Sequence, residues 1–395
     1  MGKTGCVVPC WFSQANDILN DNQNPNNHPN NNSHKRGPPR VKFPFPIIDP
    51  HIHQWDLLNT PRILSWPKRL LGWNRKLYDT AIRFGASETD RRYVGRADYV
   101  AHDYLPHDYG QDAAQLPIKQ VVHVEAEWRD REGQGLVGET RWLEGLFRNS
   151  PVALGGIVGH VELQRPDAGA VITAHRQASP RFVGVRQMLA FDLDPGIMRF
   201  CPRPYLSRDA HWRAGLALLE QHNLSFDAWF FHHQLDELVV LARQFPGLTF
   251  VLDHMGTPIG VGGQFASYGR TEAARDVTLR TWQMHLQELA ELPNVMVKLS
   301  GLFMPVVGWG YEHRTTPPTL DELMQGAGPL FEFVLQAFGV DRCMFASNFP
   351  MDKVSLSLSQ LYEFYAALVA HYPEAERRKL FHDNAARIYR LGDLS

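Results

Sequence analysis

The chain is poor in cysteine, and this scarcity is the first constraint on its class. Only Cys6, Cys10, Cys201 and Cys343 occur among its 395 residues. They form neither a Cys-x-x-Cys motif nor the dense framework that cross-links small secreted domains. The composition therefore excludes a disulfide scaffold, and we expect the protein to work in a reducing compartment.

A long apolar run and a secretory signal pattern are both missing. The sequence contains no stretch of about 18 apolar residues, the length that crosses a bilayer. Near the N-terminus, the short apolar stretch at residues 7–12 is interrupted by Gln14, Asn16 and Asp17, unlike a basic-then-apolar signal. We therefore expect a cytoplasmic protein that does not associate with membranes.

An excess of one charge is also absent. The chain has 40 Lys and Arg residues against 42 Asp and Glu residues, a net charge of -2. This balance gives no basic surface for nucleic acid. With 44% hydrophobic residues the chain can bury a large core, so we expect one large enzyme domain whose partner is a small-molecule substrate.

The composition changes near residue 40. Residues 1–40 are rich in Asn, Pro and His, and residues 22–32 read NQNPNNHPNNN. Such a segment cannot bury enough apolar surface to offset the entropy lost on ordering. We expect a disordered leader over residues 1–40 and one folded domain over residues 41–395.

Strand-like and helix-like segments alternate from residue 41 onward. Helical patterns occur at residues 139–148, 212–222, 235–245, 277–291 and 330–338, with a closing helix near 374–391. Eight apolar runs lie between them, at residues 47–53, 120–127, 153–162, 182–188, 225–233, 249–254, 295–300 and 343–348. This alternation predicts an α/β fold, a (β/α)8 TIM barrel with its active site at the carboxyl ends of the strands.

The segment between the first two predicted strands is too long for an ordinary βα connection. It covers residues 57–119 and contains six aromatic residues: Trp66, Trp73, Tyr78, Tyr93, Tyr99 and Tyr104. Insertions at this end of a barrel commonly become lids or subunit contacts. We expect most of these side chains to form the core of the insertion, and a homodimer is compatible with its size.

Histidines at predicted strand ends are the main chemical signal. His51 and His53 are two residues apart, so a strand directs both imidazoles to one face. His254 ends the sixth run, and barrel closure would bring it to the same cavity, where the three could ligate a metal or polarise a carbonyl. Asp253, directly before His254, should face away if the strand is regular. Trp55, two residues after His53, is an expected substrate contact.

Other polar residues follow neighbouring strands. His232 and His233 end the fifth run, and alternation directs one of them inward as a substrate contact.

Glu125 and Glu127 share one face with His123 if the second strand continues. These carboxylates could bind metal, orient a histidine or form an ion pair with Arg186. Arg186 itself suits either capture of a substrate carboxylate or a structural ion pair, and both readings stay open.

The order of these motifs resembles a known family. The His-x-His pair is followed by Gly-Val-Arg-Gln at residues 184–187, Asp-His-Met-Gly at 253–256, Asn-Val-Met-Val-Lys-Leu-Ser-Gly at 294–301, Phe-Ala-Ser-Asn-Phe-Pro at 345–350 and Asp-Asn-Ala-Ala-Arg-Ile-Tyr at 383–389. Over about residues 41–391 this pattern resembles the amidohydrolase-related family of metal-dependent TIM-barrel hydrolases. Within that family it is most similar to the branch of 2-pyrone-4,6-dicarboxylate lactonase and the sugar-acid lactonases.

The resemblance implies hydrolysis of a lactone of a small organic or sugar acid. It places His51, His53 and His254 around the carbonyl and an Asp of the eighth strand as the base that activates water. The chain instead has Asn348 at that position. An amide cannot serve as a general base, because its carbonyl oxygen is scarcely basic.

Three explanations for Asn348 stay open. Asp352 takes over as base, although we expect it to be an exposed loop acid. Alternatively, a metal-bound hydroxide forms with help from Glu125, or hydrolytic activity has been lost. We favour a working hydrolase.

The implied metal site consists of His51, His53, His254 and Glu125. Because one anionic ligand is missing, we expect a divalent metal such as zinc to bind weakly or not at all. The other functions compatible with the pattern are a zinc-dependent decarboxylase of an unsaturated or aromatic acid and a non-catalytic barrel.

Overall fold

The computed structural model describes residues 43–62, 65–130 and 133–392. The expected disordered leader therefore lies outside the described residues, together with Cys6 and Cys10. Cys201 and Cys343 are buried and free of disulfide bonds.

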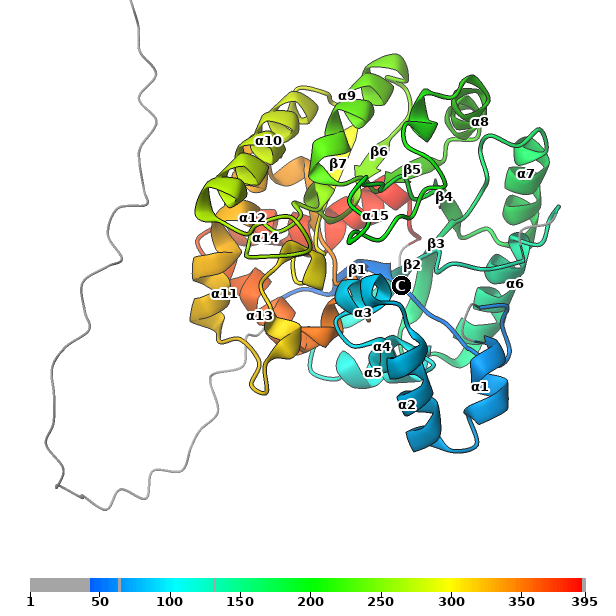
Figure 1. The fold of residues 1–395 in the computed structure, drawn as a ribbon. Coiled ribbons are helices and arrows are strands. Elements are labelled where there is room, and N and C mark those ends of the chain that lie inside the picture. The colour runs from blue at the N-terminus through cyan, green and yellow to red at the C-terminus, as the bar shows by residue number, and fades with distance from the viewer. Residues whose placement is uncertain (1–42, 63–64, 131–132, 393–395) are drawn as a thin grey trace, which may run out of the picture. The chain divides into compact units, whose positions relative to one another are not determined.

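Eight parallel strands form one sheet in chain order, as Figure 1 shows. The backbone N–H of Asn348 donates to the carbonyl of His51 at 2.9 Å, and that of His53 donates to Phe349 at 2.8 Å. These bonds bring the last strand to the first and nearly close the barrel, which confirms the predicted (β/α)8 fold. The strands are β1 (Ile47–Ile52), β2 (Ile118–Val124), β3 (Ala153–Gly159), β4 (Phe182–Arg186), β5 (Ser225–Ala228), β6 (Phe250–Leu252), β7 (Val295–Leu299) and β8 (Cys343–Phe345).

Several strands end earlier than predicted. The predicted segments extended to residues 127, 254 and 348, whereas β2, β6 and β8 end before them. Glu127, His254 and Asn348 have φ angles of 56°, 54° and 56°. These values lie in the left-handed region, where the two-residue alternation of a strand no longer holds.

Helices α6 to α13 surround the strands (Figure 1). In α9, Leu235, Leu238 and Leu241 are buried at a spacing of three residues, whereas Arg243 is exposed, the pattern of a helix packed on a sheet. The sequence patterns did not predict α7, α11 or α13. The eight helices are α6 (Val137–Leu146), α7 (Ala168–Ala178), α8 (Ala210–Gln221), α9 (Leu235–Gln244), α10 (Glu272–Ala290), α11 (Leu320–Gly326), α12 (Gly328–Phe338) and α13 (Leu358–Leu368).

The insertion between β1 and β2 forms five short helices that lie together in Figure 1. Tyr78 and Ile82 pack with Ala97 and Ala101 in a small core of their own, whereas Trp73 is 77% exposed. The helices are α1 (Ser65–Leu71), α2 (Arg75–Gly85), α3 (Glu88–Val94), α4 (Ala97–Val100) and α5 (Pro106–Asp112).

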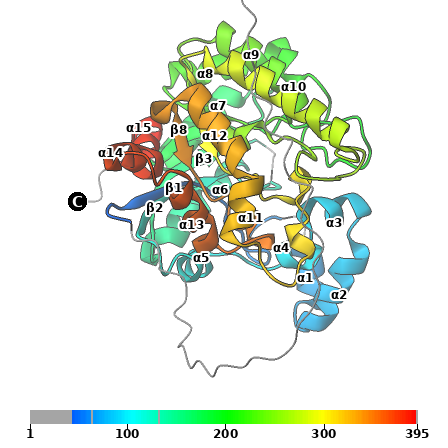
Figure 2. The ribbon, with the colours of Figure 1, turned by 90° about the vertical axis from the view of Figure 1, so that its left-hand side faces the viewer.

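The C-terminal segment closes the opposite end of the barrel. The predicted closing helix consists of α14 (Glu374–Arg378), a π-helical turn (Lys379–Asp383) and α15 (Asn384–Tyr389). Ile388 and Tyr389 of α15 pack against interior strand residues such as Val122 and Met344. Figure 2 shows α15 and the insertion on opposite sides of the strands. Within the described ranges, no helix combines the length and apolar character that a membrane span requires.

Candidate active site

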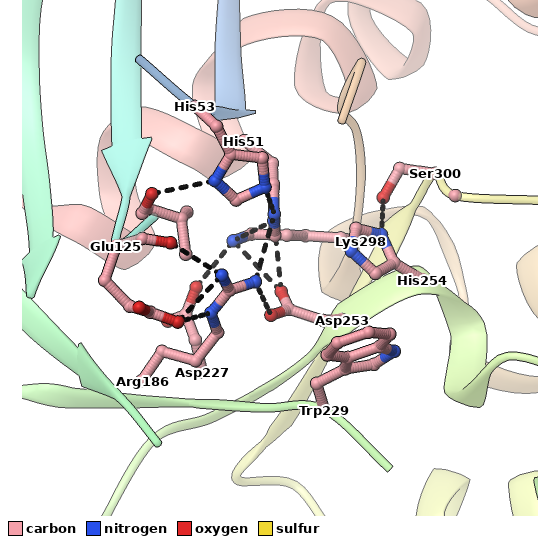
Figure 3. Close-up of polar contacts among 12 residues, drawn as sticks. His51, His53, Glu125, Arg186, Asp227, Trp229, Asp253, His254, Lys298 and Ser300 are labelled. Carbon is pink, nitrogen blue, oxygen red and sulfur yellow. Dashed lines mark hydrogen bonds and ion pairs between the residues drawn. The ribbon is translucent and has the colours of Figure 1, made fainter. Parts of the chain in front are cut away.

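The His-x-His pair converges as its spacing predicts. The Nε2 atoms of His51 and His53 lie 3.2 Å apart. His53 Nδ1 lies 2.9 Å from the carbonyl oxygen of Val124. Burial is the largest effect on both histidines: it lowers the pKa of His53 to about 4 and that of His51 well below its usual value. Two neutral imidazoles therefore face each other inside the barrel (Figure 3).

His254 reaches the same place from a turn. It follows β6 with a φ of 54°, and Met255 with a φ of 51° continues the turn. The ring of His254 lies 4.5 Å from that of His51, centroid to centroid, and its Nδ1 lies 3.0 Å from Ser300 Oγ. Left-handed backbone is unfavourable for a residue with a side chain, and such residues are concentrated at functional sites. Here the turn directs the imidazole at the His-x-His pair.

The expectation that Asp253 faces away is wrong. Its carboxylate is fully buried and points into the site, 3.3 Å from His51 Nδ1. It also lies 3.2 Å from Lys298 Nζ and 3.6 Å from Arg186 Nη1. The regular strand ends at Leu252, so alternation does not extend to Asp253. Although burial raises its pKa, Lys298 and His51 outweigh this effect and hold the pKa well below its usual range.

Arg186 forms a buried ion pair with Glu125. Arg186 Nε lies 2.9 Å from Glu125 Oε1, and Nη2 donates to the Glu125 carbonyl at 2.7 Å. Burial raises the pKa of Glu125, but Arg186 and then His160 bring it down to about 2. Of the two roles considered for Arg186, the structure contains the ion pair.

The proposed common face of His123, Glu125 and Glu127 is absent. Glu127 is exposed and has left-handed backbone. His123 Nε2 accepts a hydrogen bond from the backbone N–H of Gln54 at 3.0 Å. The face is lost because β2 ends at Val124.

The sequence patterns did not predict a second charged group beside the histidines, which Lys298 and Asp227 form. Lys298 in β7 is fully buried, and its Nζ lies 2.5 Å from Asp227 Oδ2 in β5 and 3.0 Å from His51 Nδ1. The Tyr389 hydroxyl donates to the same Asp227 oxygen at 2.8 Å. A signal was available, because a Lys or Asp within an apolar strand needs a buried partner.

Asn348 and Asp352 form a pair beside the site. Asn348 Nδ2 donates to Asp352 Oδ1 at 3.5 Å, and the backbone N–H of Gly301 donates to Asp352 Oδ2 at 3.1 Å. The expectation of an exposed Asp352 is wrong, since it is fully buried. Its burial raises its pKa well above the usual value, whereas the hydrogen bonds from Asn348 and Gly301 act in the opposite direction.

The remaining expected substrate contacts lie elsewhere in the structure. His233 Nε2 lies 3.6 Å from Asp192 Oδ2, and His232 Nδ1 accepts from the backbone N–H of Ile259 at 3.3 Å. Trp55 donates to the carbonyl of His102 at 2.6 Å and lines a cavity of about 250 Å³ between the insertion and the loop after β8, which contributes Pro350 and Lys353. None of these three side chains has a described contact with His51 or His254.

Three aromatic side chains, Tyr93, Phe200 and Trp229, form a cap over His254. The Trp229 ring lies 5.9 Å from the His254 ring, and the Phe200 ring lies 4.6 Å from Trp229 and 5.0 Å from Tyr93. Tyr93 belongs to α3, so the insertion contributes to the cover. Beneath this cap His51, His53 and His254 are only 0%, 6% and 2% exposed. Of these three aromatic side chains, Trp229 is the one with a described contact with His254.

Three residues of the site, His51, Asp253 and His254, are arranged as possible metal ligands. His51, Asp253 and His254 place possible ligand atoms within 4.8 Å of one another, and His53 Nε2 is adjacent. Imidazole and carboxylate are ligands that suit zinc.

The charges around this group fit a divalent ion poorly. Arg186 Nη1 lies 3.5 Å from His51 Nε2, and Lys298 Nζ lies 3.0 Å from His51 Nδ1. Both cations would repel a metal ion bound to this ring. Glu125, expected as a ligand, is already paired with Arg186. Arg186 and Lys298 therefore oppose the binding of a divalent metal at His51.

Comparisons with known proteins agree with the fold and the motifs. A family model described as amidohydrolase matches residues 48–391. The chain is 30% identical over 347 residues to protein y4mH of Sinorhizobium fredii (strain NBRC 101917 / NGR234), which covers 87% of this chain and 98% of that protein. It is 28% identical over 299 residues to an L-fucono-1,5-lactonase of Burkholderia multivorans (strain ATCC 17616 / 249), and the match covers 74% of this chain and 88% of that protein.

Solved structures show the same architecture. An amidohydrolase from Burkholderia multivorans with bound HEPES superimposes with a TM-score of 0.65 at 24% identity, over 88% of this chain and all of that chain. A crystal form of it with bound zinc gives a TM-score of 0.63 at 23% identity, over the same shares.

Proposed function

The chain belongs to the amidohydrolase family, and from this premise we propose that it hydrolyses the ester bond of a lactone derived from a small organic or sugar acid. One observation carries the proposal: His51, His53 and His254 converge beside Arg186 at the carboxyl ends of the strands. The Burkholderia lactonase relative supports the same reaction class.

The proposed reaction begins when a water oxygen bonds to the lactone carbonyl carbon. The carbonyl oxygen then takes up negative charge. Arg186 Nη1, which lies 3.5 Å from His51 Nε2, is placed to donate to that oxygen. His254 Nε2 accepts the proton of the water and returns it to the ring oxygen as the carbon–oxygen bond breaks.

We assign the role of base to His254. Burial lowers its pKa to about 3, with Arg186 and Lys298 acting in the same direction and Asp253 opposing them. The imidazole is therefore neutral at pH 7. Ser300 contacts its Nδ1, and no hydrogen bond from the described residues reaches its Nε2.

Two other candidates for the base fit less well. Asn348 is an amide, and Asp352 is a buried acid whose pKa is raised well above its usual value. Its two carboxyl oxygens already accept hydrogen bonds from Asn348 Nδ2 and from the backbone N–H of Gly301. We assign both residues to holding the loop after β8, where Asn348 also donates through its backbone to His51.

The pairing of Arg186 narrows the substrate class. Its Nε and Nη2 both contact Glu125, and its Nη1 lies 3.6 Å from Asp253 Oδ2, so two buried carboxylates already surround the guanidinium. We therefore favour a hydroxylated sugar-acid lactone over a lactone dicarboxylate. We also propose that a divalent metal, zinc included, binds weakly or not at all, because Arg186 and Lys298 flank His51.

The test is proton release from a lactone panel containing L-fucono-1,5-lactone, a second sugar-acid lactone and 2-pyrone-4,6-dicarboxylate. The protein is assayed as purified, after chelation, and with zinc added back. We expect turnover of a sugar-acid lactone that survives chelation and is lost in His254→Gln. His233→Gln is the matched control, because His233 lies outside the cluster, and it should retain turnover.

Each other outcome rejects part of the proposal. Turnover only with zinc would reject the metal-independent mechanism. Silence across the panel would reject lactone hydrolysis. Release of carbon dioxide from an unsaturated or aromatic acid would then identify a decarboxylase, and new turnover in Asn348→Asp would identify a natural chain that only binds its ligand.

A further inference from the structure

One part of the insertion is rich in exposed apolar side chains. Ten large hydrophobic side chains are exposed in the described ranges, and half of them belong to the insertion: Leu58, Leu70, Trp73, Leu77 and Phe84. Trp73 is 77% exposed and Phe84 is 84% exposed. Exposed apolar side chains are normal when scattered, but a group of them marks an interaction site. We call Leu70, Trp73, Leu77 and Phe84 the outer face of the insertion.

Local contacts hold this face together where α1 ends and α2 begins. Trp73 Nε1 donates to the carbonyl of Leu70 at 3.1 Å, so the indole lies against the last turn of α1. Asn74 then caps α2, because its Oδ1 accepts from the backbone N–H of Leu77 at 3.2 Å. Phe84 follows Leu77 by seven residues, about two helical turns, and therefore lies on the same side of α2. Figures 1 and 2 show α1 and α2 at the outer end of the insertion, away from the strands.

The other side of α2 is already buried. Tyr78 and Ile82 are 1% and 7% exposed, and they pack with Ala97 and Ala101 in the small core of the insertion. These two residues give α2 the apolar side that holds it in the fold. The row of Leu77 and Phe84 points away from that core. The helix is therefore apolar on two sides, and packing within the insertion accounts for one of them.

The segment that carries this face is strongly basic. Residues 65–85 contain five Lys and Arg residues and one acidic residue, Asp79, whereas the whole chain has a net charge of -2. Asp79 is shared, because its Oδ2 lies 3.7 Å from Arg75 Nε and its Oδ1 lies 2.8 Å from His102 Nε2. It therefore offsets little of the positive charge. The exposed basic residues of the segment are Arg69, Arg75, Lys76 and Arg83.

The basic and apolar side chains are arranged side by side. Lys76 and Arg83 directly precede Leu77 and Phe84, so a basic row runs along α2 about 100° around the helix from the apolar row. Helices that lie on membranes combine Trp, Phe and Leu with Lys and Arg. Their apolar side chains enter the boundary of the acyl chains, and their cations are attracted to anionic lipid. We propose that the outer face of the insertion docks the protein on an anionic lipid surface.

Two other occupants fit this face less well. A two-fold contact of the face with itself would bring two basic segments together, and like charges repel. An acidic protein with a groove for a basic helix would have to enclose α2. The packing of Tyr78 with Ala97 and Ala101 leaves α2 open on one side only. A lipid surface needs only that side.

The proposal revises the expectation that the protein does not associate with membranes. That expectation rested on the lack of an apolar run and of a signal pattern in the sequence. A helix that lies on the surface of a bilayer requires neither. The proposal is also independent of lactone hydrolysis, because none of the residues of the outer face belongs to the active site.

The first test is sedimentation of the full chain with lipid vesicles. Vesicles of phosphatidylcholine and phosphatidylserine in equal parts are compared with vesicles of phosphatidylcholine alone. We expect at least tenfold stronger binding to the mixture, and we expect high salt to weaken it, because salt screens the attraction between the basic segment and the lipid. Equal binding to both kinds of vesicle, or no binding to the mixture, would overturn the proposal.

The second test removes the apolar row. Leu77 and Phe84 are 49% and 84% exposed, so Leu77→Ala combined with Phe84→Ala leaves the core of the insertion intact. We expect vesicle binding to become at least tenfold weaker. The matched control is Met284→Ala combined with Leu193→Ala, since these side chains are 50% and 80% exposed elsewhere on the surface. An equal loss in both variants would reject the role of α2.

The third test removes charge. Arg75→Gln combined with Lys76→Gln should weaken binding to the mixture at least tenfold, because each basic residue near an anionic surface contributes to binding. The control is the adjacent basic pair Arg378 and Lys379, which are 54% and 40% exposed. Arg378→Gln combined with Lys379→Gln should bind like the natural chain, and an equal loss there would reject a local basic site.

The other occupants give different results. A dimer of the natural chain that dissociates in the variant of Leu77 and Phe84, without vesicle binding, would identify a second copy as the occupant and reject the lipid surface. Binding to soluble polyglutamate without binding to vesicles would identify an acidic protein and reject it as well.

Discussion

Replacing Glu125 by Gln tests how much the buried ion pair between Glu125 and Arg186 contributes to the stability of the fold. The change removes one charge from a pair in which Nε and Oε1 lie 2.9 Å apart, with the two side chains 5% and 0% exposed. A pKa reduced from the usual 4.5 to about 2 corresponds to about 3 kcal/mol of stabilisation at neutral pH. Breaking a buried ion pair from one side costs about 3–5 kcal/mol.

We therefore expect Glu125→Gln to lower the free energy of unfolding by about 3 kcal/mol at pH 7, measured by urea denaturation. The sign with pH follows from the depressed pKa. The stabilisation is present above the usual value of 4.5 and is lost as pH falls through about 2. The difference in the free energy of unfolding between the natural chain and Glu125→Gln should therefore become smaller as pH falls from 4.5 to about 2.

The control is a pair with the same spacing at the surface. Arg165 Nε and Asp167 Oδ1 also lie 2.9 Å apart, but the side chains are 44% and 37% exposed. Asp167→Asn should change the free energy of unfolding far less than Glu125→Gln does, because solvent screens an exposed ion pair. Equal losses in the two variants would refute the argument that burial makes Glu125 important.

Three further results are expected. Gly301 has a φ of 70°, and a Cβ added there would lie 2.4 Å from His254 Cγ. Gly310 has the same φ, but a Cβ added there would have no other atom within 4 Å. Gly301→Ala should therefore reduce kcat by about 100-fold or more and Gly310→Ala should not; similar activities would contradict the placement of His254. Because the pKa of His254 is lowered to about 3, the acid limb of kcat/KM should lie well below pH 6.5, and a limb near 6.5 would exclude His254 as the base. Burial raises the pKa of Asp352, so its contribution to the stability of the fold is present below the usual pKa of 3.8 and is lost as pH rises. The melting temperature of Asp352→Asn, relative to that of the natural chain, should therefore increase from pH 5 to pH 9. A constant difference in melting temperature would show that Asp352 is ionised when folded.

The amino-acid sequence by itself determined the barrel and the first half of the site. Eight apolar runs correspond to the eight strands, because apolar periodicity and turn residues are local properties of the chain. His51 and His53 converge for the same kind of reason. Their spacing of two fixes their common face wherever the strand lies in the protein.

Local patterns failed where the chain left its strands. Asp253 points inward because β6 ends at Leu252, before it, and His254 and Met255 then adopt left-handed backbone. Asp352 is buried because the Gly301 region, about 50 residues earlier in the chain, packs over it. Neither turn has a periodicity from which its direction could be predicted.

Only the tertiary structure decided the chemistry of the centre. Lys298 meets His51 across 247 residues of sequence, and Tyr389 meets Asp227 across 162. The sequence shows that a Lys in an apolar strand needs a partner, but barrel closure selects which one. The ion pairs and the charge balance of the active site depend on contacts between distant strands, so only the closure of the barrel fixed them.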